Sequence, residues 1–164
     1  MTKVRRFEDL ICWQKARVLA NSIHSLTRHS EFSKDFRLRD QILDASGSVM
    51  HNIAEGSDSG TDPEFIRFLK MARRSASEVQ SELYLALDRK YIVEAELKQA
   101  YDQADEAKRL INGLIAYLRN SQNPANKISE DQGDYFIIPP EDLADSDEDN
   151  TDVDQPDNHQ TTDY

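Results

Sequence analysis

The chain has 164 residues, with 20 Lys and Arg against 31 Asp and Glu, a formal net charge of −11, and a single cysteine, Cys12. This length accommodates one domain of ordinary size plus an appendage. One cysteine excludes an internal disulfide and a cysteine-rich zinc site. The apolar runs are far shorter than the ~20 residues of a membrane helix, and acidic residues interrupt the basic start, so we expect a cytoplasmic protein without a membrane span.

The net charge is unevenly distributed along the chain. Residues 1–120 hold 19 Lys and Arg against 18 Asp and Glu, a net charge of +1. Residues 121–164 hold Lys127 alone against 13 acids, a net charge of −12. The low overall isoelectric point therefore describes the tail and says nothing about what the rest of the chain binds.

Four segments repeat apolar residues at steps of three and four, which predicts four amphipathic helices. They run over about Phe7–Arg28, Phe36–Glu55, Pro63–Tyr91 and Glu94–Arg119. Short connections between long helices force antiparallel neighbours, so the expected fold is all-α, an up-down-up-down four-helix bundle over residues 1–120. Cys12 lies on the apolar side of the first helix and is expected to be a small buried residue.

The segment between the second and third helices contains residues typical of helix ends. Gly56 can adopt the left-handed conformation that ends a helix. Asp62 can accept hydrogen bonds from the free amides of the next helix, and Pro63 suits its first position. We therefore expect the second helix to end near Gly56 and Asp62 to cap the third.

A second set of apolar residues lies beside or opposite the predicted core faces. One interpretation is a wide core with scattered exposed apolar residues, which are normal on soluble proteins. The interpretation we favour is a subunit interface, because large apolar patches are usually buried. The candidate interface residues are Leu10, Trp13, Val18, Ile66, Phe68, Tyr84 and Leu87.

The sequence contains no pattern typical of catalysis. A di-iron bundle needs two Glu-x-x-His motifs and the chain has none, while its four histidines lack paired ligand spacing. Phosphate loops and nucleophile motifs are absent too. Glu78 and Glu82, one turn apart, could be paired carboxylates, but a solvated face or an ion pair with Arg74 is the commoner arrangement. We expect no catalytic residue, no metal and no cofactor.

The third predicted helix carries a group of basic residues. Arg67, Lys70 and Arg74 follow the spacing of one helix face, with Arg73 beside them. Such a face suits phosphate oxygens, and Arg37 and Arg39 could extend it. The alternative is a solvated face whose charges are balanced by nearby glutamates.

The tail, residues 121–164, is too polar and acidic to bury a core, so we expect it to be disordered. An apolar segment interrupts it over residues 135–140 and is either a docking segment or a tolerated cluster. Its candidate docking residues are Tyr135, Phe136, Ile137 and Ile138. The acids themselves could occupy a basic groove in place of nucleic acid, or mimic DNA towards another partner.

Several stretches, in this order and spacing, resemble the four-helix-bundle proteins first noted as products of intervening sequences in bacterial large-subunit ribosomal RNA genes. That family includes the accessory variability determinant of diversity-generating retroelements. The resemblance covers about residues 7–119. Its stretches are Phe7-Glu8-Asp9-Leu10, Trp13-Gln14-Lys15-Ala16, Asn52-Ile53-Ala54-Glu55-Gly56, Glu64-Phe65-Ile66-Arg67-Phe68-Leu69, Ala72-Arg73 with Ser75, Glu78 and Glu82, and Leu114-Ile115 with Tyr117-Leu118.

The resemblance implies a small bundle assembled as a ring, commonly a homopentamer, without enzymatic activity. In the retroelement branch it also implies a basic surface that binds a reverse transcriptase and its template RNA. The leading hypothesis is therefore a ring-forming scaffold that recruits a protein partner. The alternative is a nucleic-acid-binding accessory protein of a reverse transcriptase, which contacts RNA or DNA through the basic helix face.

Overall fold

The structure is a computed structural model that describes residues 6–121. Four long helices account for most of these residues: α1 (Ile11–Leu26), α2 (Phe36–Ser57), α3 (Asp62–Asp88) and α4 (Glu94–Ser121). Two single-turn 3-10 helices, η1 (Phe7–Asp9) and η2 (Phe32–Lys34), precede α1 and α2. The acidic tail and its apolar segment at residues 135–140 lie outside the described residues.

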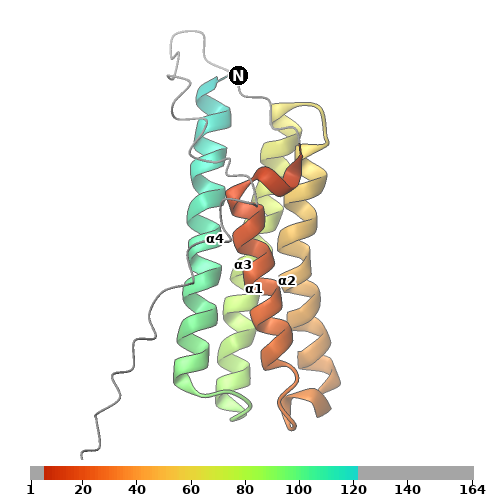
Figure 1. The fold of residues 1–164 in the computed structure, drawn as a ribbon, viewed down its shortest axis with the longest axis vertical. Helices are drawn as coiled ribbons and strands as arrows, with labels where there is room; N and C mark the ends of the chain where they lie inside the picture. The colour runs from red at the N-terminus through yellow and green to blue at the C-terminus, as the bar shows by residue number, and fades with distance from the viewer. Residues whose placement is uncertain (1–5, 122–164) are drawn as a thin grey trace, which may run out of the picture.

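The helices alternate in direction, as Figure 1 shows by following the colour from α1 to α4. Each helix packs against two neighbours, since α1 and α3 each contact both α2 and α4. The predicted all-α, up-down-up-down bundle is therefore confirmed. Among the described residues, no helix is long and apolar enough to cross a membrane.

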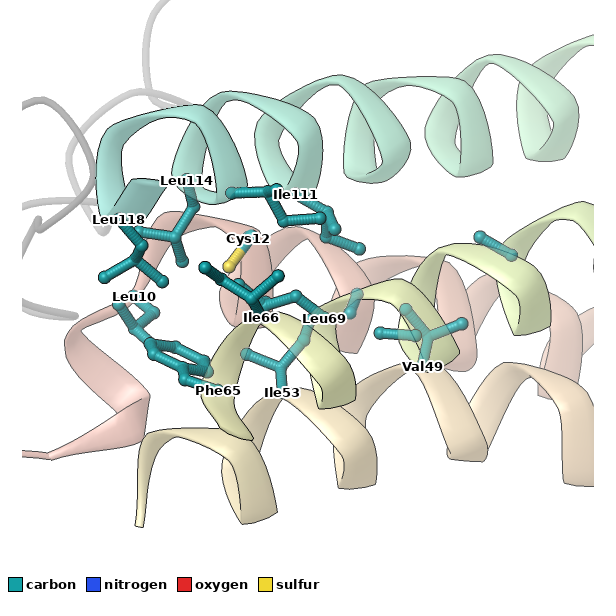
Figure 2. Packing of buried hydrophobic residues seen from close by; sticks show 14 residues of the cluster. Leu10, Cys12, Val49, Ile53, Phe65, Ile66, Leu69, Ile111, Leu114 and Leu118 are labelled. Carbon is teal, nitrogen blue, oxygen red and sulfur yellow. The ribbon is translucent and has the colours of Figure 1, made fainter. Parts of the chain in front are cut away.

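The core consists of two apolar clusters stacked along the bundle. The upper cluster, at the end where α1 begins and α4 ends, draws Cys12, Ile53, Leu69 and Ile111 from the four helices. Figure 2 shows these side chains converging from all four helices. The lower cluster includes Ile23, Ile42, Leu83 and Ala104. Cys12 is buried as predicted, and burial raises the pKa of its thiol to about 12.

The second helix ends near Gly56, as predicted, but Gly56 does not adopt the left-handed conformation that was expected to end it. The helix continues to Ser57, and Gly56 is not among the residues with positive φ. A Cβ atom at this position would lie 2.7 Å from both Phe65 Cδ2 and Phe68 Cβ. The glycine is therefore required by the close approach of α3 to α2 and not by a turn.

The start of α3 also differs from the prediction. Thr61 occupies the N-cap position without a capping hydrogen bond from its side chain, and Asp62 is the first helical residue. Pro63 lies in the first turn, where its missing amide donor has no consequence. The Asp62 carboxylate accepts a hydrogen bond from Ser121 Oγ at 3.5 Å, so the end of α4 lies beside the start of α3.

At the opposite end, Asp35 connects the start of α2 to the α3–α4 turn. Its Oδ1 accepts the Leu38 amide, and its Oδ2 accepts Arg89 Nη1 at 2.6 Å and the Tyr91 hydroxyl at 3.1 Å. These bonds, the one from the Leu38 amide foremost, lower the pKa of Asp35. The turn contains Lys90 with a φ of 61°, in the left-handed conformation that the sequence pattern did not indicate.

Candidate nucleic-acid interface

The basic residues predicted on the third helix do lie on its surface. Arg67, Lys70, Arg73 and Arg74 are all exposed, and no acid occurs between residues 65 and 77. Their spacing places Arg67, Lys70 and Arg74 along one side of α3. Lys70 and Arg74 form no ion pair within the described part of the chain.

The antiparallel packing of α4 against α3 adds cations that the sequence analysis missed. Residues 107–121 hold Lys108, Arg109 and Arg119 and no acid. Lys108 Nζ donates to Gln80 Oε1 on α3 at 2.8 Å, and Arg119 lies seven residues, two turns, beyond Asn112, which Arg73 contacts. We define the basic face as the seven cations Arg67, Lys70, Arg73, Arg74, Lys108, Arg109 and Arg119.

The bonds between α3 and α4 hold these cations in place without neutralising them. Arg73 Nη1 donates to Asn112 Oδ1 at 2.9 Å, and the acceptor of Lys108 is likewise a neutral amide oxygen. Each hydrogen bond fixes a side chain across the helix pair, while its full positive charge remains available to an anion.

Two cations of the basic face do have acidic partners. Arg67 bonds Glu64 through both Nε, at 2.9 Å, and Nη2, and its guanidinium lies 4.7 Å from the centroid of the Phe68 ring. The bond lowers the pKa of Glu64 and raises that of Arg67. Arg109 Nε is 3.7 Å from Asp105, in a solvent-exposed pair that binds weakly. Lys70, Arg73, Arg74 and Lys108 therefore carry most of the uncompensated charge.

Arg37 and Arg39 do not extend this face, which corrects the prediction. Both arginines lie at the start of α2. The bond between Asp35 and Arg89 shows that the start of α2 lies beside the end of α3, whereas the basic face lies in the first half of α3. At ~1.5 Å per residue, Arg74 is ~20 Å from that end. Arg39 is half-buried, bonds Asp40 and the Ser33 carbonyl, and lies over the Phe36 ring.

The structure divides the predicted interface residues into three groups. Leu10 and Ile66 are buried in the upper core cluster, at 0% and 8% exposure, so their placement on an outer surface is wrong. Trp13, Phe68 and Leu87 are partly buried, Trp13 against Phe7 with ring centroids 5.0 Å apart. Of the seven, only Val18 and Tyr84 are exposed, at 49% and 51%.

Glu82 is not on a solvated face, contrary to the prediction. Only 7% of the residue is exposed, and within the described residues its Oε2 has no hydrogen-bond partner. Burial, with the nearby Glu78 charge as the second cause, raises the pKa of Glu82. Glu78 is exposed, so the two glutamates are not a matched catalytic pair.

A pocket of about 320 Å³ lies between the last turn of α1 and the first turns of α4. His29 there has Nε2 3.6 Å from Glu96 and Nδ1 3.3 Å from the Tyr91 carbonyl oxygen, so it connects the two helix ends. Ser25 in the same pocket donates to the Asn21 carbonyl and not to this histidine. No nucleophile–base pair results. No cluster of metal-ligating side chains is found among residues 6–121 either.

These features define a class: an antiparallel four-helix bundle with a basic face over two of its helices. Residues 8–113 match the family model of the 23S rRNA-intervening sequence protein, so the chain belongs to that family. A solved structure is similar to it, that of a protein of unknown function from the S23 ribosomal protein family of Bacteroides thetaiotaomicron. The two are 24% identical with a TM-score of 0.60, over 64% of this chain and 98% of that chain. The likeness concerns the fold. A search of curated proteins finds no match.

Proposed function

We propose that the protein is a non-enzymatic accessory protein that binds the phosphate backbone of a nucleic acid through the basic face. The observation that carries this proposal is the separation of charge: two adjacent helix segments, 65–77 and 107–121, hold seven cations and no acid. A bundle whose residues 1–120 have a net charge of only +1 thus concentrates its positive charge on one surface. Backbone phosphates bind such surfaces with little dependence on base sequence.

The packing beneath the face supports this function. The basic segments of α3 and α4 also supply Leu69, Ala72, Ile111 and Leu114 to the upper core cluster. Because these residues fix both helices, the cations are presented by a rigid framework, which reduces the ordering cost of binding. The resemblance to the retroelement accessory proteins points to RNA as the first nucleic acid to test.

The proposal is tested by the salt dependence of RNA binding. A chain ending at Ser121 is suitable, because every core residue that the structure describes lies between Leu10 and Leu118 and because the Bacteroides protein has the same fold with almost no additional chain. Its affinity for a fluorescent 20-nucleotide single-stranded RNA is measured by anisotropy at several salt concentrations. We expect K70A/R74A to weaken binding and reduce the slope of log K against log salt by ~1.4, at ~0.7 per phosphate contact.

The matched control removes two exposed cations at the other end of the bundle, in R28A/R37A. Both double variants lower the net charge by the same amount. Equal effects of the two would show that binding follows net charge and not the basic face. Absence of RNA binding by the chain ending at Ser121 would refute the proposal.

The second candidate function is the ring-forming scaffold that recruits a protein partner such as a reverse transcriptase. It is favoured by exposed apolar residues at the end of the bundle away from the basic face, where Phe36 is 64% and Val93 61% exposed, with Tyr84 and Leu85 nearby on α3. Light scattering after size exclusion tests the assembly. We expect a pentamer-like mass for the protein and a smaller mass for Y84S/L85S. A monomeric mass for the unmodified protein would exclude the ring.

A further inference from the structure

The basic face and the end of the described chain lie at the same end of the bundle. Ser121, the last residue of α4, donates a hydrogen bond to Asp62, the first residue of α3. Arg67 and Arg74 follow 5 and 12 residues later, which places them ~8 and ~18 Å along the α3 axis from this point. Figure 1 shows the same arrangement, with α4 ending beside the start of α3. The described part of the chain therefore ends beside the basic face.

The residues that follow Ser121 are complementary in charge to that face. Residues 122–164 contain 13 acids and a single basic residue, Lys127. Nine of the acids fall within residues 141–157, which contain no Lys or Arg. The basic face offers seven cations, of which only Arg67 and Arg109 have an acidic partner within residues 6–121. A polyanionic segment and an uncompensated polycationic surface thus belong to one chain.

The connecting segment is long enough for the two to meet. Nineteen residues, 122–140, separate Ser121 from the acidic segment, and the 20 steps from residue 121 to residue 141 span at most ~70 Å. The farthest cation of α4, Lys108, is 13 residues before Ser121, or ~20 Å along the helix. A tethered segment also meets its site at an effective concentration in the millimolar range. Even weak ionic pairing would then occupy the face.

We propose that residues 141–157 of the same chain bind the basic face and compete with nucleic acid for it. This inference rests on the proposed function, because it assigns a regulator to the same surface. The segment presents carboxylates where RNA would present phosphates, so only one of the two polyanions occupies the face at a time. High salt weakens both contacts.

Contact between the acidic segment and the basic face is tested directly in the full chain with a spin label. Cys12 is buried and its thiol pKa is raised, so a cysteine introduced as Ser146→Cys is the reactive one. We expect the label to broaden the amide resonances of residues 67–74 and 108–112, but not those near Arg37, and we expect 0.5 M salt to abolish the effect. Absence of this selective broadening would overturn the proposal. A mixture of spin-labelled protein and ¹⁵N-labelled protein detects broadening between chains. If all of the broadening proved to be of this intermolecular kind, the proposal would also be overturned.

Competition is tested by RNA binding of full-length proteins. A variant with the nine acids of residues 141–157 replaced by Asn or Gln is compared with the unmodified chain, using the same 20-nucleotide RNA. We expect at least about tenfold tighter binding by the variant at low salt, and a difference that shrinks as salt is added. Equal affinities would overturn the competition while leaving the proposed function intact. Selective broadening without RNA binding by either protein would retain the docked segment and refute the proposed function. Tighter binding without selective broadening would show that the tail only repels RNA.

Discussion

The close approach of α3 to α2 at Gly56 can be tested through Gly56→Ala. In a helix interior this substitution normally stabilises by ~1 kcal/mol, because alanine has the higher helix propensity. Here the new methyl group would lie 2.7 Å from Phe65 Cδ2 and from Phe68 Cβ. The Phe68 Cβ atom cannot move away without moving the α3 backbone, and overpacking of this kind costs ~1–3 kcal/mol. We therefore expect no stabilisation, and a net destabilisation of up to ~2 kcal/mol.

Gly47→Ala, in the same helix, is the matched control. Its new methyl group would have no neighbour closer than His51 Cε1 at 3.7 Å, an ordinary contact. This variant should gain ~0.5–1 kcal/mol from helix propensity alone. Urea denaturation followed by circular dichroism, at one protein concentration, gives both free energies of unfolding. Stabilisation of both variants by similar amounts would refute the close packing of α2 on α3.

Substitutions at three further positions probe the opposite end of the bundle and the buried glutamate. Lys90→Gly should stabilise by roughly 0.5–1 kcal/mol, because it relieves a left-handed residue, whereas Lys90→Ala keeps that conformation and should change the free energy of unfolding little; urea denaturation distinguishes the two. Asp35→Asn should lower the Tm at pH 7. Because hydrogen bonds lower the pKa of Asp35, its contribution is lost as the pH falls below 3.8, so the Tm difference should narrow there; a constant difference would contradict this. Glu82→Gln should raise the Tm at pH 7. Because the pKa of Glu82 is raised, protonation of Glu82 stabilises the folded protein, and this stabilisation is lost as the pH rises. The Tm values of the variant and of the wild-type protein, measured by thermal melts, should therefore converge below pH 4.5.

The four helices were predictable because their apolar residues repeat with helical spacing over long segments. The prediction failed where a local signal conflicted with packing. Glycine is a residue type that commonly ends helices, yet Gly56 lies within α2, where Phe65 and Phe68 of α3 pack against it. Nothing in the sequence around Lys90 indicates a left-handed residue. The Lys90 amide donates to the Leu87 carbonyl and the Tyr91 amide to the Ala86 carbonyl, and these two bonds stabilise the left-handed conformation. Such constraints arise from the assembled structure and are invisible in a local pattern.

The width of the core was underestimated for a related reason. Leu10 and Ile66 lie beside the apolar residues that repeat at steps of three and four, which suggested a second surface. In this bundle each helix contacts two neighbours, so residues beside that repeat are buried between adjacent helices, while the repeat itself is buried at the centre. Leu10 and Ile66 are therefore core residues, and the surface left for assembly is smaller than predicted.

The basic face was half predictable. The cations of α3 follow one another closely enough to be noticed, whereas Lys108 and Arg119 join them only because α4 runs antiparallel beside α3. The missing signal was the absence of acids from residues 107–121, in a chain whose preceding helical turns contain Asp102, Asp105 and Glu106. Searching for acid-free segments, and not for clusters of bases alone, would have found it.

The residues that carry the family resemblance explain the fold far better than the function. Gly56 admits Phe65 and Phe68. Asn52 donates hydrogen bonds to the carbonyl and hydroxyl oxygens of Ser48. The Ser48 hydroxyl also accepts a hydrogen bond from the Ser75 hydroxyl, and this bond joins α2 to α3. We therefore expect substitution of any of these residues to disturb the packing of α2 on α3. The motif therefore identifies a way of packing two helices. A function specific to this chain is better sought in residues that this packing does not use, and within residues 6–121 the exposed Lys70 and Arg74 of the basic face meet this condition.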